Sequence, residues 1–355
     1  MRKQILLMVG PTGLPDRVIN AMNRQVISHR GAEFSKITKQ LDENLKKIFQ
    51  TKNDVLELTS SGTGAMEAAV QNCFSVGDEV IVAVIGVFSE RMAVICETFG
   101  LKVTRVVAKL GEIVTPEQVL KAMTSSTKGV FIVHNESATG VRSDIKAFGA
   151  AIANTNALLV VDSVSAIGGM DLQMDNWGVD VVFASAQKAL MGTPGLALIA
   201  LSEKAWAAAD KSTIPKFYMD LKAARAINKK GQHPWTPAIY SILALHEATN
   251  MIVEEGLQNV FARHLKLSNM VIDGMEELGV KLYPKSRDYA SITVNTFAME
   301  NSPEFVNKLE EQYGIIVGGG QGELYDTTFR VGTMGYVSEN DIVAFLHAAK
   351  EILKK

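Results

Sequence analysis

Residues 157–201 read ALLVVDSVSAIGGMDLQMDNWGVDVVFASAQKALMGTPGLALIAL, and this stretch decides the fold class. It holds three short runs, 157–162, 179–184 and 196–201, that are apolar almost throughout. Strands that are covered on both faces have this pattern, whereas a half-exposed strand alternates apolar and polar residues. We therefore expect these runs to be strands inside a sheet that other elements cover on both sides.

Similar runs extend upstream, and helix-like segments separate most of them. They comprise residues 79–85, 102–107 and 129–134. Strands that alternate with helices in this way are typical of a parallel sheet. The sequence predicts an α/β fold with a mostly parallel sheet flanked by helices.

The last third of the chain has a different pattern. Helices are expected over 238–255, 259–278, 303–312 and 339–353, and a strand over 291–297. This pattern predicts a smaller C-terminal α+β domain. We divide the chain into an N-terminal segment (1–15), a large domain (16–256) and a small C-terminal domain (257–355).

Composition narrows the class of protein. The 355 residues carry a formal net charge of -2, which gives no electrostatic reason to expect nucleic acid or an acidic membrane surface. No apolar stretch approaches the ~18 residues of a membrane span, and the run 5–9 is too short for a signal peptide. The cysteines Cys73 and Cys96 lie in helical patterns, as buried free thiols in a reducing compartment would. A cytoplasmic protein is expected.

Polar side chains follow several predicted strands at the point where each strand ends. They lie in residues 134–139, 162–165 and 185–188. Because ligands of open α/β sheets bind outside the carboxyl ends of the strands, we expect one composite site here.

An anion site is indicated by Ser60-Ser61-Gly62-Thr63-Gly64, which follows an apolar run and precedes a helical pattern. Glycines allow close backbone approach, and the free N–H groups of a helix start attract a phosphate. A plain helix cap is the alternative for such a run. The absence of a Walker lysine and of a full dinucleotide fingerprint disfavours ATP and NAD.

Three charged residues complete the candidate chemistry. Asp162 ends a strand, where a carboxylate can bond a protonated ring nitrogen, hold a metal or cap a helix. Lys188 follows a buried strand, where desolvation lowers the pKa of an amine and makes it a Schiff-base nucleophile. Arg330 can clamp a carboxylate, or it can pair with a neighbouring acid. Together they match the needs of a pyridoxal phosphate enzyme.

From GPTGLPDRV (10–18) to FRVGTMG (329–335), the chain resembles the class V aminotransferases, within the fold type I pyridoxal phosphate enzymes. It is most similar to the group that holds alanine–glyoxylate, serine–glyoxylate and serine–pyruvate aminotransferases. The motifs that carry this resemblance are SSGTGAMEAA (60–69), HNESATGV (134–141), VDSVSAIGG (161–169) and SAQKALMGTPG (185–195).

The resemblance implies pyridoxal 5'-phosphate as cofactor, no metal, and ping-pong transamination between a small amino acid, alanine or serine, and glyoxylate or pyruvate. Lys188 would form the internal aldimine and carry the proton, while Asp162 would hold the ring nitrogen protonated. Arg330 would clamp the substrate carboxylate. The remaining cofactor contacts would come from Ser61, Gly62, Thr63, Phe88, Ser137, Thr139, Val164, Gln187 and, from the partner subunit of a homodimer, Thr236.

Two alternatives stay open. The first is 2-aminoethylphosphonate–pyruvate transamination, for which His29 and Arg30 could supply an extra cation. The second is a non-catalytic subunit of a larger assembly. The chain also departs from some relatives, which place a Tyr just before the position of Thr236, where this chain reads Gln232-His233-Pro234-Trp235. A second phosphate contact from the partner is therefore an open point.

Overall fold

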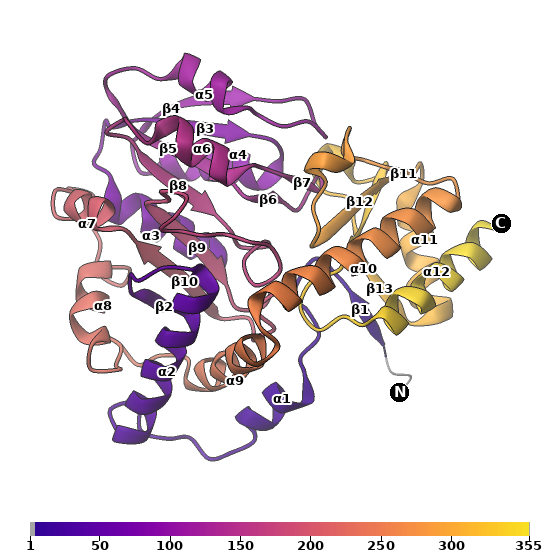
Figure 1. Ribbon diagram of the computed structural model, residues 1–355, viewed down its shortest axis with the longest axis horizontal. Helices are drawn as coiled ribbons and strands as arrows, with labels where there is room; N and C mark the ends of the chain where they lie inside the picture. The colour runs from indigo at the N-terminus through magenta and orange to yellow at the C-terminus, as the bar shows by residue number, and fades with distance from the viewer. Residues whose placement is uncertain (1–3, 355) are drawn as a thin grey trace.

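The computed structural model describes residues 4–354, so the first three residues of the predicted N-terminal segment and Lys355 lie outside the described residues. The larger sheet dominates the left-hand body of Figure 1. Its strands stand in the order β2-β10-β9-β8-β5-β3-β4. Their bounds are β2 Val55–Thr59, β3 Glu79–Val84, β4 Lys102–Val107, β5 Thr127–Val133, β8 Leu158–Asp162, β9 Val181–Ser185 and β10 Leu196–Leu201.

The pairing of these strands confirms the predicted mostly parallel sheet. β3, β4, β5, β8 and β9 pair in parallel along the sheet. β10 is antiparallel to both of its neighbours, β9 and β2. It returns directly after the loop that follows β9, too short a path for the crossover that a parallel strand needs.

Apolar side chains cover both faces of this sheet, as the continuous apolar runs predicted. On one face, Ile132, Leu159 and Val182 pack against helices α2 (Ala32–Phe49), α6 (Ile145–Ile152) and α9 (Ile239–Glu255). On the other face, Phe131 and Phe183 pack against helices α3 (Gly62–Cys73), α4 (Val87–Thr98) and α7 (Glu203–Ala209). Because successive side chains of a strand point to opposite faces, each strand contributes to both cores.

A second sheet organises the right-hand body of Figure 1, in the order β1-β13-β14-β12-β11. Its strands are β1 Ile5–Leu7, β11 Lys281–Leu282, β12 Val294–Ala298, β13 Ile315–Gly319 and β14 Thr328–Gly332. Helices α10 (Leu257–Glu277), α11 (Ser302–Lys308) and α12 (Glu339–Leu353) contribute to its apolar core. The chain start also belongs here, because β1 pairs in parallel with β13.

The remaining elements connect these layers. They are α1 (Asp16–Met22), α5 (Pro116–Ala122), α8 (Leu221–Asn228), the β6–β7 pair (Asn135–Glu136, Val141–Arg142), two 3₁₀ turns (Arg287–Tyr289, Gly322–Leu324) and a π-helical turn (Leu309–Tyr313) that continues α11. The strand expected over 291–297 begins only at Val294, because the Ser291 hydroxyl accepts the backbone N–H groups of Thr293 and Val294. These local bonds hold the preceding residues in a turn.

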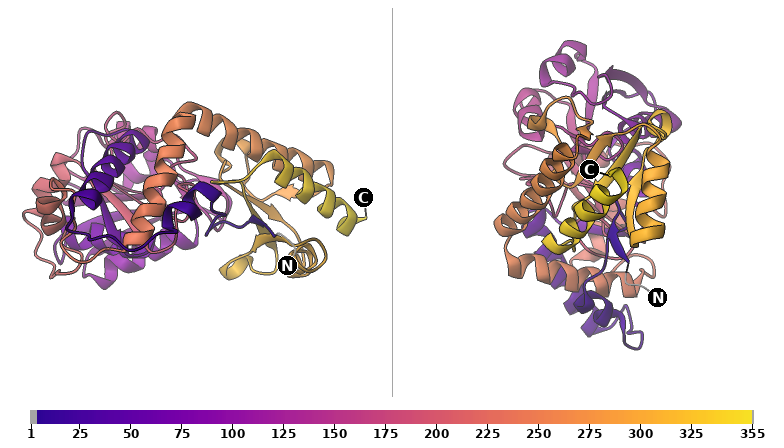
Figure 2. Two further views of the ribbon diagram at one scale, coloured as in Figure 1. Left: turned by 90° about the horizontal axis from the view of Figure 1, so that it is seen from below. Right: turned by 90° about the vertical axis from the view of Figure 1, so that its right-hand side faces the viewer.

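Gly256 separates α9 from α10, and its φ of 84° is one that other residues rarely adopt. Beyond it, α10 runs from the larger body toward the smaller one (Figure 2). We propose this glycine as the boundary between the large domain (16–256) and the small domain (257–355). Within residues 4–354, no helix combines the length and apolar character that crossing a membrane requires.

Candidate active site

One cavity lies where the parallel strands of the larger sheet end. The space inside it is about 590 Å³, part of which is open to solvent. Strand ends and the loops after them supply its walls, because the carboxyl ends of β2, β3, β5, β8 and β9 meet at one edge. Its lining residues are Ser61, Gly62, Thr63, Met66, Phe88, Arg91, Asn135, Ser137, Asp162, Val164, Ser165, Gln187 and Lys188.

Lys188 is positioned by the loop after β9. Its Nζ donates a hydrogen bond to the Val9 carbonyl, and the Thr12 hydroxyl donates to the Lys188 carbonyl at 3.0 Å. Burial and the Arg330 charge together lower the pKa of Lys188 to about 8, against the opposing effect of Asp162. The lysine is therefore partly neutral near physiological pH, which a nucleophilic amine requires.

Asp162 ends β8 and is only 4% exposed. Its Oδ1 accepts the backbone N–H of Val164 at 2.8 Å. Burial and the nearby Glu136 together raise the pKa of Asp162 to about 7, against the opposing hydrogen bond from Val164. A carboxylate so desolvated gains most from a cationic partner, such as a protonated ring nitrogen.

The predicted anion site is the start of helix α3. Ser61 is its N-cap, with its Oγ accepting the Gly64 N–H at 3.4 Å. A Cβ on Gly62 would lie 2.9 Å from Cγ2 of Val164, so only glycine leaves this wall of the cavity undisturbed. Free N–H groups and the helix dipole make this turn suited to a phosphate.

Of Phe88, Ser137 and Thr139, which are expected to contact the cofactor, two line the cavity and one does not. Phe88 lines the cavity, as does Ser137, whose hydroxyl donates to Ser165 Oγ at 2.8 Å. Thr139 does not line it. The Thr139 hydroxyl is fully buried and donates to the Ile85 carbonyl at 3.3 Å.

Arg330 comes from β14 of the smaller sheet and is 5% exposed. It does not line the cavity itself, but it lies beside it. Its Nε donates to the Gly319 carbonyl at 2.8 Å and its Nη1 to the Ser137 carbonyl at 3.1 Å. Burial lowers the pKa of Arg330 to about 10, which leaves it cationic at neutral pH. Among the described residues, no carboxylate forms an ion pair with it.

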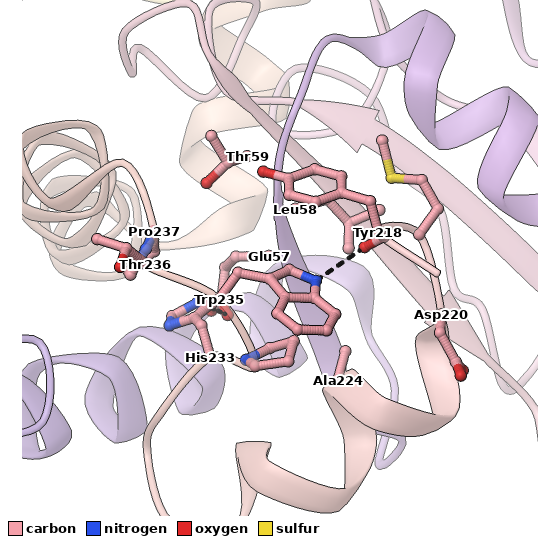
Figure 3. Close-up of a pocket in the computed structure, with 12 residues that line it drawn as sticks. Glu57, Leu58, Thr59, Tyr218, Asp220, Ala224, His233, Trp235, Thr236 and Pro237 are labelled. Atoms are coloured by element: carbon pink, nitrogen blue, oxygen red, sulfur yellow. Dashed lines mark hydrogen bonds and ion pairs between the residues drawn. The ribbon is translucent and has the colours of Figure 1, made fainter. Parts of the chain in front are cut away.

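Thr236 is exposed and lines a different cavity, of about 370 Å³, together with Trp235 and His233 (Figure 3). The Trp235 Nε1–H donates to the Tyr218 carbonyl at 3.1 Å. His233 Nε2 lies 3.2 Å from Oε2 of Glu57, the middle residue of β2. Within one chain, Thr236 is thus not part of the cavity that holds Lys188.

The sequence predicts no individual role for several residues of the site, although Asn135 and Ser165 lie in the strand-end segments expected there. Met66, Arg91, Asn135 and Ser165 all line the cavity. Arg91 follows Phe88 by three residues, and a helix places residues with this spacing on one face. Because Phe88 is a predicted cofactor contact, the spacing could have predicted that Arg91 faces the cavity too. Val9, whose carbonyl accepts from Lys188, could not be found, because β1 joins the smaller sheet through a distant pairing.

The cavity fits the cofactor that the sequence resemblance implies. Buried acceptor atoms with no hydrogen-bond partner gather at this site, namely Gln187 Oε1, Ser185 Oγ and Asn135 Oδ1. Such atoms are costly unless a ligand satisfies them. A helix start for a phosphate, a carboxylate for a ring nitrogen and a desolvated amine for an aldehyde lie in one enclosure.

Comparisons with known proteins agree with this geometry. The family described as "Aminotransferase class-V" matches residues 5–345. A soluble hydrogenase small subunit of Synechococcus sp. is 35% identical, over 99% of this chain and 93% of its own length. A serine–glyoxylate aminotransferase of Methylorubrum extorquens is 33% identical, over 97% and 90%. The crystal structure of an alanine–glyoxylate aminotransferase from Nostoc sp. superposes with a TM-score of 0.95 at 27% identity, covering 99% of this chain and 96% of that one.

Proposed function

The chain belongs to the class V aminotransferase family, and we propose that it moves an amino group between alanine or serine and glyoxylate or pyruvate. As an enzyme of this family it is a pyridoxal phosphate-dependent transaminase, and its fold is fold type I of such enzymes, as predicted. The choice of substrates and the ping-pong order are proposals. The observation that supports transamination is that Lys188, Asp162 and the α3 start line one cavity, beside a cationic Arg330.

Lys188 has two roles in this proposal. Its amine would hold the cofactor through the aldehyde carbon, and once free it would take the proton from the substrate α-carbon. Both roles need a neutral amine, and the lowered pKa of about 8 supplies one without a separate base. The bound cofactor supplies an electron-withdrawing ring at the α-carbon.

Asp162 would hold a proton on the ring nitrogen of the cofactor. Its burial makes a lone negative charge unfavourable, so the carboxylate binds a cationic ring nitrogen in preference to solvent. Phe88 and Val164 line the same cavity and would contact the ring. Ser61, Gly62, Thr63 and Gln187 would hold the phosphate.

Arg330 is the proposed clamp for the substrate carboxylate. Its Nε and Nη1 bind carbonyl oxygens, which fixes the guanidinium plane but leaves its charge without a carboxylate among the described residues. Nη1 also donates to Gln321 Oε1 at 3.3 Å, so among the described residues the N–H groups of Nη2 are left to bond a carboxylate. Both partners of the proposed reaction, the amino acid and the keto acid, carry that group.

The active unit is proposed to be a homodimer. Thr236 is exposed and lies outside the cavity of its own chain, as a residue that serves the partner's phosphate site would. The exposed rings of Phe217 and Tyr218 stack on Trp235 beside it and would be covered by a second copy. We also propose a cytoplasmic location, which the free buried thiols of Cys73 and Cys96 support.

Half-reactions test the substrate proposal. The yellow holoprotein is mixed with alanine, serine or 2-aminoethylphosphonate, and the loss of visible cofactor absorbance is followed in single turnovers. Alanine or serine should react fastest, and Lys188→Ala should abolish the reaction. A fastest reaction with the phosphonate would favour the alternative, for which Arg30, bonded to the His233 carbonyl on the Thr236 loop, is the candidate cation. A yellow protein inert toward every amino acid would favour a non-catalytic subunit.

A further inference from the structure

Arg91 occupies a place in the cavity that neither the motifs nor the comparisons assign. It lies on α4, one turn after Phe88, and its guanidinium sits 4.7 Å from the centre of the Phe88 ring. Its Nη1 donates to the Thr63 hydroxyl at 3.4 Å. Arg91 therefore reaches from α4 to the start of α3, where the phosphate cradle lies.

Among the described residues Arg91 forms no ion pair, and the carboxylate of Asp162 in the same cavity acts on it only through the longer-range charge interaction. The nearby Arg105 shows the contrast, because it forms ion pairs with Glu90 at 2.9 Å and Glu97 at 2.6 Å, both on α4. A partly buried cation that faces a cavity without a counter-ion is suited to an anionic ligand. A guanidinium has five N–H donors, and the bond to Thr63 uses one of them.

The residues proposed to hold the phosphate at the α3 start carry no permanent positive charge. A phosphate monoester carries about -1.5 to -2 charges at neutral pH, whereas a helix N-terminus offers the equivalent of about half a positive charge. Ser61, Thr63 and Gln187 contribute neutral groups only. Of the described residues that line the cavity, the cations are Lys188 and Arg91, and Lys188 is committed to the aldehyde of the cofactor.

We propose that Arg91 is a direct ligand of the cofactor's phosphate group. Stacking on Phe88 holds its guanidinium plane, and the contact with Thr63 directs it toward the α3 start. Arg330 is the other unpaired cation at the site, but it contacts Ser137 and Gly319 instead. The two arginines thus serve different anions, the phosphate and the substrate carboxylate. The inference rests on the cofactor assignment and is independent of the proposed substrates.

The test uses binding to the apoprotein, without any turnover. Dissociation constants of pyridoxal 5'-phosphate and of phosphate-free pyridoxal are measured for the wild type, Arg91→Gln and Arg91→Lys. Arg91→Gln should weaken pyridoxal 5'-phosphate roughly 10- to 100-fold, as the loss of a hydrogen bond to a charged group does, and leave pyridoxal unchanged. Arg91→Lys should regain part of the loss, because it keeps the charge. Arg105→Gln is the matched control, since it loses ion pairs to the same helix outside the cavity.

Three results would overturn the proposal. Equal weakening of both compounds would mean that Arg91 acts through the Phe88 ring or the fold. Unchanged binding of both would mean that it does not touch the phosphate. Unchanged binding together with a raised KM for a dicarboxylic amino acid would assign Arg91 to a substrate carboxylate. A wild-type protein that binds neither compound would instead contradict the cofactor assignment itself.

Discussion

The carboxylate of Glu136 accepts the backbone N–H of Phe88 at 3.0 Å. Glu136 lies on β6 and is fully buried, and its side chain reaches the start of helix α4. The same carboxylate accepts the N–H of Ser89 at 3.0 Å and of Ala138 at 3.2 Å. Burial raises the pKa of Glu136, and these hydrogen bonds oppose that shift. Glu136 thus ties the turn that carries Phe88 to the β6–β7 segment that carries Ser137.

Replacing Glu136 with Gln should loosen this turn. In the glutamine variant an NH₂ group replaces one carboxylate oxygen, and it cannot accept the N–H group that this oxygen now accepts. The loss of this hydrogen bond should lower the free energy of unfolding by about 1–3 kcal/mol. Denaturant unfolding of the apoprotein measures this loss, and cofactor dissociation should accelerate because the Phe88 ring is less firmly held. Glu43→Gln, an exposed acid on α2, is the control and should change neither quantity. An unchanged unfolding free energy would show that the buried carboxylate does not stabilise the turn.

Asp162 should make the stability of the apoprotein fall as pH rises. Its pKa is about 7 in the folded chain against 3.8 for the ordinary group, so between these values the folded state binds more protons than the unfolded state. The free energy of unfolding must then decrease from pH 4 to 7, by on the order of 4 kcal/mol for a fully desolvated carboxylate. Asp162→Asn removes this dependence.

Urea unfolding of wild-type and Asp162→Asn apoprotein at pH 4.5 and pH 8 measures that difference. The variant should gain stability relative to the wild type at the higher pH. Adding cofactor should restore the stability of the wild type at the higher pH, because the protonated ring nitrogen supplies a cationic partner for Asp162. An equal difference at both pH values would show that Asp162 is ionised throughout and therefore better solvated than its burial implies.

Arg330→Gln should lower kcat/KM for alanine or serine roughly 10- to 100-fold, as expected for one charged hydrogen-bond partner. The dissociation constant of the cofactor should stay close to that of the wild type, because Arg330 lies outside the cavity lining. Steady-state kinetics and cofactor titration on the same preparation separate the two effects. An equal loss of cofactor affinity would make Arg330 a structural residue.

Thr236 can be tested by mixing two inactive or impaired chains. Lys188→Ala abolishes one site, and Thr236→Val should weaken cofactor binding in the partner's site. In a hybrid dimer, the cavity that retains Lys188 would receive Thr236 from the other chain, so a single intact site should form. Co-expression with two tags and purification of the hybrid should therefore restore wild-type cofactor affinity at that site. A hybrid as weak as the Thr236→Val homodimer would show that Thr236 acts within its own chain, or not at all.

The fold could be predicted where the sequence pattern is local. The apolar runs predicted β3, β5, β8, β9 and β10, because strands covered on both faces need few polar residues. The β-branched residues of 102–107 predicted β4, which is a half-exposed edge strand. β13 and β14 were not found. Their pairing brings Gly318 and Gly319 opposite Arg330 and Phe329, and glycines carry no strand pattern. β1 depends on Ile315, some three hundred residues away, which no local pattern reveals.

The residues of the candidate site could likewise be predicted where they lie next to a local sequence pattern. Asp162 and Lys188 follow apolar strands directly, so the strand-end argument places them together, and the structure brings them into one cavity. Arg91 escaped notice because an arginine on a helix usually faces solvent. Thr236 could be placed only by resemblance, since its proposed contact lies on another copy of the chain.

The covalent link to Lys188 is the central claim, and one measurement tests it most directly. The holoprotein is reduced with borohydride, digested and examined by mass spectrometry for the peptide that carries the phosphopyridoxyl group. The account predicts that the group lies on Lys188, in the peptide that follows β9. A phosphopyridoxyl group on any other lysine, or on none, would contradict it.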